Sequence, residues 1–446
     1  MLSPRAKRSM LGRRARRYET LPTTGTASPL PVPPEVEHQA RDTAKWREGD
    51  EEVHPLDSPL RAPVPIVAAS RPSSCPRDAA LGAINGILVT PVLMSFAAII
   101  FQDAVFAPHL PRLVRLVIVS GTVHQLVFTL RSTLPFAVGS VQDAGLIFLS
   151  AIASAVAAAV RAGGADDEAM LSTVCFALCG STAALGVALV VTGRLKLASA
   201  VQYLPMPVIG GYLAYIGFFC GAAGLSFTAA NGAPVVGAAG WARLLRSPSA
   251  LLRAAPSVAA GAGLYWALRR FRSVATLPAC MLAMVVAFYA VLLAAGVSLD
   301  EARAAGWVAP ASPSMPVWGA WAFFKPGEVI WSAILPRIFP DFAGMFLVVA
   351  FSSSLDIAAV EMELGAPLDY GRELQTVGWS NICSGLTGGF TGSYIFSQTI
   401  FNLRAGVDSR LAGATTVAVQ AAVVMLPVSL RCSFAFSGRS SLPPRC

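Results

Sequence analysis

About eleven apolar runs follow one another between residues 79 and 430, and most of them are long enough to cross a bilayer. A helix of about 20 residues spans the hydrocarbon core, where backbone groups find no water and only helices or closed barrels can satisfy them. The sequence therefore predicts an all-α polytopic membrane protein. We expect spans at 79–101, 113–130, 134–160, 171–192, 204–226, 255–268, 275–296, 340–360, 374–389, 391–403 and 411–430.

The composition excludes a soluble protein of this length, because 54% of the residues are hydrophobic and only 13% are charged. The net charge of +9 comes from arginines in the N-terminal tail and in short loops, a distribution that sets membrane topology. We therefore expect no nucleic-acid partner. The eight cysteines show no metal-binding spacing, and Cys175 and Cys179 lie four residues apart on one apolar run, as packing residues do. We predict no metal, no other cofactor and no disulfide framework.

Residues 1–77 are rich in Pro, Ser, Thr and charge and show no apolar period, so we expect a disordered cytosolic tail. No apolar segment near Met1 suggests a cleavable secretory signal, although an organelle transit peptide stays an alternative. With the tail inside, the loop charges follow the positive-inside rule except at Arg243 and Arg246. The plasma membrane and a vacuolar or other organelle membrane both stay open.

Two of the runs are interrupted in the same way. The third begins with STLPFAVGSVQDAG at 132–145 before a continuous helix from Leu146, and the tenth begins after Gly388 and Gly389. Broken segments at matching places in two halves indicate an inverted-repeat transporter with its site near the membrane midplane. The alternative is that the glycines only allow neighbouring helices to pack closely.

A half-helix start leaves backbone N–H groups without partners and aims a positive dipole end at the solute. We expect the small polar residues around the two breaks to bind the solute. The predicted substrate-binding residues are Gly139, Ser140, Gln142, Ser393, Ser397, Gln398 and Thr399.

Two carboxylates fall inside apolar runs, Asp143 in the third and Asp356 in the eighth. An ionisable group at bilayer depth is costly unless it faces a cavity or a partner, so both are predicted coupling residues. Asp356 could instead be hydrogen-bonded for packing, and Asp143 could cap the helix beside it. Glu361 and Glu363 lie near the end of the eighth run, where a solvated helix terminus explains them.

Three stretches resemble the SulP family of sulfate permeases and related anion transporters. They are GGFTGSYIFSQTIFNLR at 388–404, LPMPVIGGYLAYIGFFCGAAGL at 204–225, and the surroundings of Thr90 and Pro91. The resemblance implies a seven-plus-seven inverted-repeat fold with half-helices in spans 3 and 10. It covers about 79–413, whereas the family continues for about three spans and a STAS domain. We therefore expect an incomplete second repeat, a transmembrane domain at 78–432 and an unstructured or misread terminus at 433–446.

The chain departs from the resemblance at two places in the site. Many anion-transporting relatives have an arginine where this chain has Gln398, and the glutamate linked to proton coupling in some relatives falls at 352–354, which is Ser-Ser-Ser. The pocket thus lacks a cation and keeps two acids. This difference raises the alternative of a cationic or zwitterionic solute.

The sequence predicts a secondary active transporter that works by alternating access, with an inorganic anion such as sulfate or bicarbonate as the first choice of substrate. A proton-coupled carrier of a cationic or zwitterionic solute, such as a basic amino acid, is the alternative. A non-transporting membrane scaffold is another. No enzyme is expected, because the four histidines lie in the tail or the first two spans and no nucleophile–base pair emerges. The expected partners are a small solute and the lipid bilayer, and a homodimer stays open.

Overall fold

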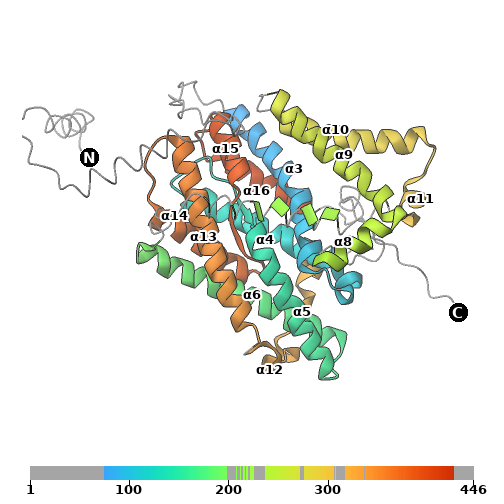
Figure 1. Cartoon of the computed structure of the whole chain (residues 1–446). Helices are drawn as coiled ribbons and strands as arrows, with labels where there is room; N and C mark the ends of the chain where they lie inside the picture. Colours follow the sequence, from blue (N-terminus) through green and yellow to red (C-terminus); the bar gives the residue numbers. More distant parts are fainter. Residues whose placement is uncertain are drawn as a thin grey trace, which may run out of the picture. The chain divides into compact units, whose positions relative to one another are not determined.

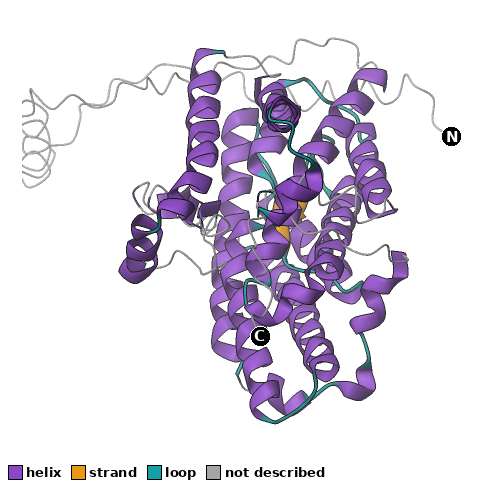
Figure 2. Ribbon diagram, turned by 90° about the vertical axis from the view of Figure 1, so that its right-hand side faces the viewer, coloured by secondary structure: helices purple, strands orange, loops and turns teal. Residues whose placement is uncertain are grey.

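A computed structural model describes residues 75–197, 237–271, 276–305, 307, 317–335 and 337–425, together with isolated positions between 207 and 225. All of them belong to the second of two compact units, Pro63–Cys446. In this part the chain is almost wholly helical, apart from two short strands (Figure 1, Figure 2). Nearly all of the predicted tail at 1–77, most of the predicted span at 204–226, and the terminus at 433–446 lie outside the described residues.

The helices follow the apolar runs closely, and within the described residues five segments are long and apolar enough to cross a membrane: Cys75–Ile100, Ala104–Arg131, Asp143–Ala162, Asp167–Arg194 and Phe339–Leu364. The chain order is α3 (Cys75–Ile100), η1 (Ala104–His109), α4 (Leu110–Arg131), β1 (Gly139–Val141), η2 (Asp143–Gly145), α5 (Leu146–Ala162), α6 (Asp167–Arg194), α8 (Gly237–Arg246), α9 (Pro248–Arg270), α10 (Thr276–Ala294), α11 (Leu299–Ala304), η4 (Val317–Phe323), η5 (Pro326–Glu328), α12 (Trp331–Ile334), α13 (Phe339–Leu364), α14 (Tyr370–Leu386), β2 (Gly392–Tyr394), α15 (Phe396–Arg404) and α16 (Leu411–Met425).

Polar residues at the ends of the runs set the helix boundaries. The Asp166 carboxylate accepts the Ala169 N–H at 2.9 Å and caps α6, and the Asp369 carboxylate accepts the Arg372 N–H at 3.0 Å and caps α14. Each cap satisfies one of the backbone donors that the first helical turn leaves unpaired. These caps fix where both helices enter the apolar layer.

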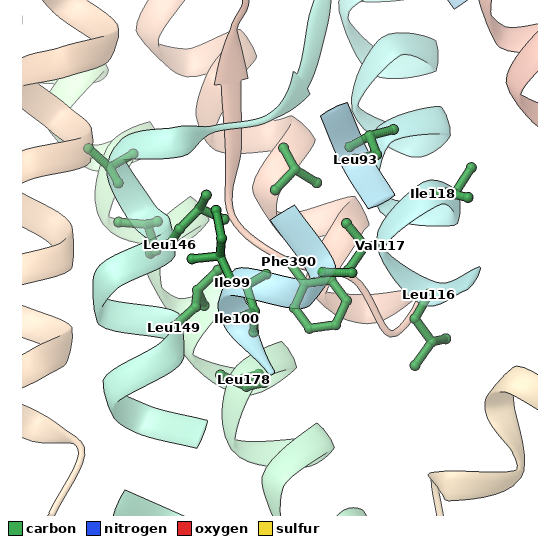
Figure 3. Packing of buried hydrophobic residues seen from close by; sticks show 14 of the residues in the cluster. Leu93, Ile99, Ile100, Leu116, Val117, Ile118, Leu146, Leu149, Leu178 and Phe390 are labelled. Atoms are coloured by element: carbon green, nitrogen blue, oxygen red, sulfur yellow. The ribbon is translucent and has the colours of Figure 1, made fainter. Parts of the chain in front are cut away.

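Helices α6 and α14 pack against each other in opposite directions through glycines. A Cβ at Gly378 of α14 would lie 2.7 Å from the Val190 nitrogen of α6, and one at Gly193 would lie 2.6 Å from the Gly371 oxygen. Such contacts leave no room for larger side chains, and they are the close backbone approach that small residues allow between membrane helices. The long helices enclose a core whose members include Leu93, Leu116, Val117, Ile118, Leu146, Leu149, Leu178 and Phe390 (Figure 3).

The segment from Glu328 onward forms only the short helix α12 (Trp331–Ile334), which is too short to cross a bilayer. Trp318 and Trp331 beside it are exposed, as aromatic residues at a membrane surface are.

Candidate solute site at two broken helices

The two interrupted segments meet as a pair of antiparallel strands. In β1 and β2, Gly139 lies opposite Tyr394, and Ser140 lies opposite Ser393. The pairing continues on either side, since the Gln142 N–H donates to the Thr391 carbonyl at 3.1 Å and the Ile395 N–H to the Val138 carbonyl at 2.8 Å. Each strand leads into a helix, β1 into η2 and α5, and β2 into α15. The predicted breaks in the third and tenth spans are thus present and face each other (Figure 2).

The strand β2 runs too close to its neighbours for any side chain at Gly392. A Cβ there would lie within 2.5 Å of His124 Cε1, and it would also overlap the Ser140 carbonyl. At the turn before β2, Gly388 has a φ of 87°, a left-handed conformation that favours glycine. The glycines of this stretch therefore have two separate roles, one at a turn and one at a close contact.

Polar side chains from α4 and α14 hold this backbone, as water cannot do in a membrane interior. His124 Nε2 lies 2.8 Å from the Phe390 carbonyl, and because a carbonyl only accepts, this nitrogen carries the proton. Asn381 accepts the Gly392 N–H at 3.0 Å and donates to the Gly392 carbonyl at 2.7 Å. Neither residue was predicted as part of the site.

Helix α13 contributes two serines to the strand pair. Gln142 Nε2 donates to Ser352 Oγ at 2.5 Å, and the hydroxyls of Ser353 and Ser393 lie 2.7 Å apart. The eighth span therefore meets both broken segments. These serines occupy the place where the SulP resemblance puts a glutamate.

Of the seven predicted substrate-binding residues, six are buried around the strand pair, and Ser397 is exposed. Thr399 makes a structural contact, since its hydroxyl accepts the Val138 N–H at 3.2 Å. Three of the predicted residues carry a buried side-chain oxygen that has no hydrogen-bond partner in the described part of the chain: Ser140 Oγ, Gln142 Oε1 and Gln398 Oε1.

The start of α15 carries free donors beside Gln398. The Ile395 N–H is used by Val138, and the Thr399 N–H is used within the first turn. Ile395 at the N-cap has no side-chain hydrogen bond to offer. Within the described part of the chain, the next three N–H groups, at 396–398, therefore have no acceptor, so this helix end can bind an anion.

The two predicted coupling residues lie near each other. Asp143 opens η2, where its Oδ1 accepts the N–H of the next residue, Ala144, at 2.8 Å, while the N-cap position of α5 is Gly145. Asp356 is half-buried on α13, which packs against η2, and it has no hydrogen-bond partner among the described residues. Neither acid has a basic side chain in ion-pair contact in the part of the chain that is described.

A third acid, Glu373, belongs to the same region and was not predicted. It lies in the first turn of α14, the helix that precedes the tenth span, and its side chain is fully buried. Its carboxylate accepts from Ser132 Oγ at 3.0 Å, the Thr133 N–H at 2.8 Å, the Thr133 hydroxyl and the Tyr394 hydroxyl. A glutamate in a first helical turn looks like a dipole partner in sequence, so its burial could be found only from the structure.

The sequence of this region matches a known family over most of the chain. The model described as "Sulfate permease family" covers residues 78–432. The chain belongs to the sulfate permease family. Within it, the "Vacuolar basic amino acid transporter VSB1" of Saccharomyces cerevisiae is 26% identical over 352 residues, which cover 77% of this chain and 34% of that protein. The chain thus spans about a third of the length of this curated relative.

Solved structures of sulfate permease relatives share the fold. The transmembrane domain of a cyanobacterium bicarbonate transporter BicA matches with a TM-score of 0.53 and 17% identity, covering 81% of this chain and 86% of that one. The overall structure of SLC26A9 matches with a TM-score of 0.57 and 14% identity, covering 93% of this chain and 64% of that one. The predicted inverted-repeat transporter architecture, with its half-helices, is confirmed.

Proposed function

We propose that this chain is a secondary active transporter that moves a small solute by alternating access around the strand pair β1–β2. The observation that supports this proposal best is the group of unpaired oxygens and N–H groups beside two opposed broken helices. A buried polar group without a partner costs about 1–3 kcal/mol, and a bound solute would remove that cost. No enzymatic activity is proposed.

The first candidate for the solute is an inorganic anion such as sulfate or bicarbonate. The free N–H groups at 396–398 and the dipole of α15 would stabilise its negative charge. Two carboxylates close together repel each other and an anion, so a proton bound by the Asp143–Asp356 pair would remove the repulsion between the two acids and reduce their repulsion of the anion. In this scheme the anion enters together with a proton, and an asparagine at either position would imitate the protonated acid.

The second candidate is a basic amino acid, and a specific observation favours it. Asp143 and Asp356 have no basic side chain in ion-pair contact among the described residues, while Gln398 stands where many relatives have an arginine. The carboxylate of an amino acid would bind at the α15 N-terminus, and its ammonium group would bind the acids. The yeast relative is named as a basic amino acid transporter.

The distribution of basic residues supports a membrane topology for the chain. We place the N-terminus in the cytosol, because the basic tail and most basic loops then lie on one side. The membrane proposed is that of the vacuole, as in the name of the yeast relative, with the plasma membrane as the alternative. Lipid is the expected surrounding partner, and a homodimer is a further proposal.

Uptake into proteoliposomes tests the proposal. The purified chain is reconstituted, and labelled sulfate, bicarbonate and lysine are offered with and without a proton gradient. Saturable uptake of one solute, absent from protein-free vesicles, is expected. No uptake of any of them under either gradient would favour the scaffold alternative.

A further inference from the structure

Glu373 contacts both broken segments at once. Ser132 and Thr133 precede β1, and Tyr394 is the last residue of β2, so one carboxylate joins the approach to the first strand and the end of the second. The carboxylate is fully buried, and its donors in the described part of the chain are all neutral. Arg410 lies nearby but donates to the backbone carbonyls of Thr129 and Ser132 instead.

The Tyr394 side chain is held on two sides. Its hydroxyl donates to Glu373, and its ring meets the Phe128 ring edge-on at a centroid distance of 4.6 Å. Successive side chains of a strand point to opposite faces, so Tyr394 faces the scaffold while its neighbour Ser393 faces α13. The position of Tyr394 thus decides where Ser393 points.

A pair of strands three residues long specifies its register only weakly. A slip by one residue would exchange the faces of all side chains in β2, and Ser393 would leave α13. The backbone hydrogen bonds cannot prevent this slip, because they can form again in another register. A side-chain contact to a fixed helix can prevent it.

We propose that Glu373 is a positioning residue that holds β2 in register with β1 and so keeps Ser393 and Gln398 in the solute site. This inference rests on the proposed function, since it treats the strand pair β1–β2 as the place where the solute binds. Glu373 does not touch the solute in this account. It acts through Tyr394 and through the segment that leads into β1.

The test compares three variants of the full chain by hydrogen exchange of the peptide covering 390–399 and by uptake kinetics. Glu373→Leu removes every acceptor, so faster exchange and a KM raised about tenfold are expected, equivalent to about 1.4 kcal/mol. Tyr394→Phe removes one bond and keeps the ring, so it should cause a smaller change of the same kind. If Glu373→Leu does not fold, Tyr394→Phe alone still tests the proposal.

Glu373→Gln should rescue both measurements nearly to wild type. Its amide oxygen can still accept the Thr133 N–H, and its amide NH2 group can donate to the hydroxyl oxygen of Ser132 or Tyr394. The matched control is Thr376→Val on the same helix, whose buried hydroxyl, within the described part of the chain, donates only to the Arg372 carbonyl one turn earlier. It should change neither exchange nor KM.

Three results would overturn the proposal: unchanged exchange in Glu373→Leu, faster exchange with an unchanged KM, or a glutamine variant as impaired as the leucine one. The last result would assign a role to the charge of Glu373 instead of its hydrogen bonds. Absence of uptake by the wild type would contradict the proposed function alone. Exchange would then still show whether Glu373 holds the register.

Discussion

The hydroxyl oxygens of Ser353 and Ser393 lie 2.7 Å apart and join α13 to β2 at the centre of the strand pair. Both residues are buried, and Ser393 is paired across the strands with Ser140, whose own hydroxyl has no partner among the described residues. The eighth span is therefore bonded directly to a broken segment beside an unpaired donor. A solute bound at the Ser140 hydroxyl would lie beside Ser393, whose position is fixed by the contact with Ser353 of α13.

A double-mutant cycle on this pair gives the first prediction. Ser353→Ala and Ser393→Ala should each raise the KM for uptake about fivefold, because a hydrogen bond of about 1 kcal/mol holds β2 in place. The double variant should be little worse than either single one, since both remove the same bond. Fully additive effects in uptake assays would show that the two serines act independently.

The second prediction concerns Gln398, whose buried Oε1 is unpaired in the part of the chain described. Gln398→Ala should raise the KM about tenfold with little loss of folded protein, because no hydrogen bond within the described protein is broken. Gln375→Ala on α14 is the control, since the one hydrogen bond of that amide to a described residue is to the Gly371 carbonyl of its own helix. A wild-type KM in Gln398→Ala, at normal expression, would remove this residue from the site.

The third prediction concerns the close approach at Gly392. Gly392→Ala places a methyl group against His124 and the Ser140 carbonyl, so the strands must separate. Overpacking of this kind costs about 1–3 kcal/mol, and the melting temperature and uptake should both fall. Gly180→Ala on α6 is the control, because nothing lies within 4 Å of a Cβ there. Equal behaviour of the two alanine variants would contradict the packing described.

Most of the fold could be predicted because a membrane helix is determined by its own residues. The run at 113–130 became α4 at Leu110–Arg131, and the run at 340–360 became α13 at Phe339–Leu364. The two breaks were visible as well, because proline and glycine beside small polar residues cannot continue a helix facing lipid. What the sequence could not show was that the breaks pair as strands, since three residues give no strand period.

The site was predicted less completely because its members come together through tertiary contacts. His124 and Asn381 occupy ordinary helical positions, and their bonds to the Phe390 and Gly392 backbone depend on how α4 and α14 pack. Thr399 was expected to bind solute, and it bonds the Val138 backbone. Asp143 and Asp356 were predicted separately as coupling residues, and their nearness depends on how α13 packs against η2.

The fourth prediction uses these two acids. If the solute is an anion, Asp143→Asn and Asp356→Asn should leave its uptake intact or raise it, because each removes a repulsive charge. The same variants should reduce the dependence of uptake on the proton gradient. If the solute is a basic amino acid, each variant should lower uptake strongly, because its ammonium group loses an ionised partner. Asp341→Asn in the first turn of α13 is the control.

The most direct test of the account is therefore uptake of labelled sulfate, bicarbonate and lysine into proteoliposomes at two external pH values, by the wild type, Asp143→Asn and Asp356→Asn. The account predicts saturable uptake of sulfate or bicarbonate that the wild type couples to protons and that both variants retain. Lysine uptake that either variant abolishes would contradict the anion assignment and favour the basic amino acid. Uptake of none of the three solutes by the wild type, in either direction of the gradient, would contradict transport itself.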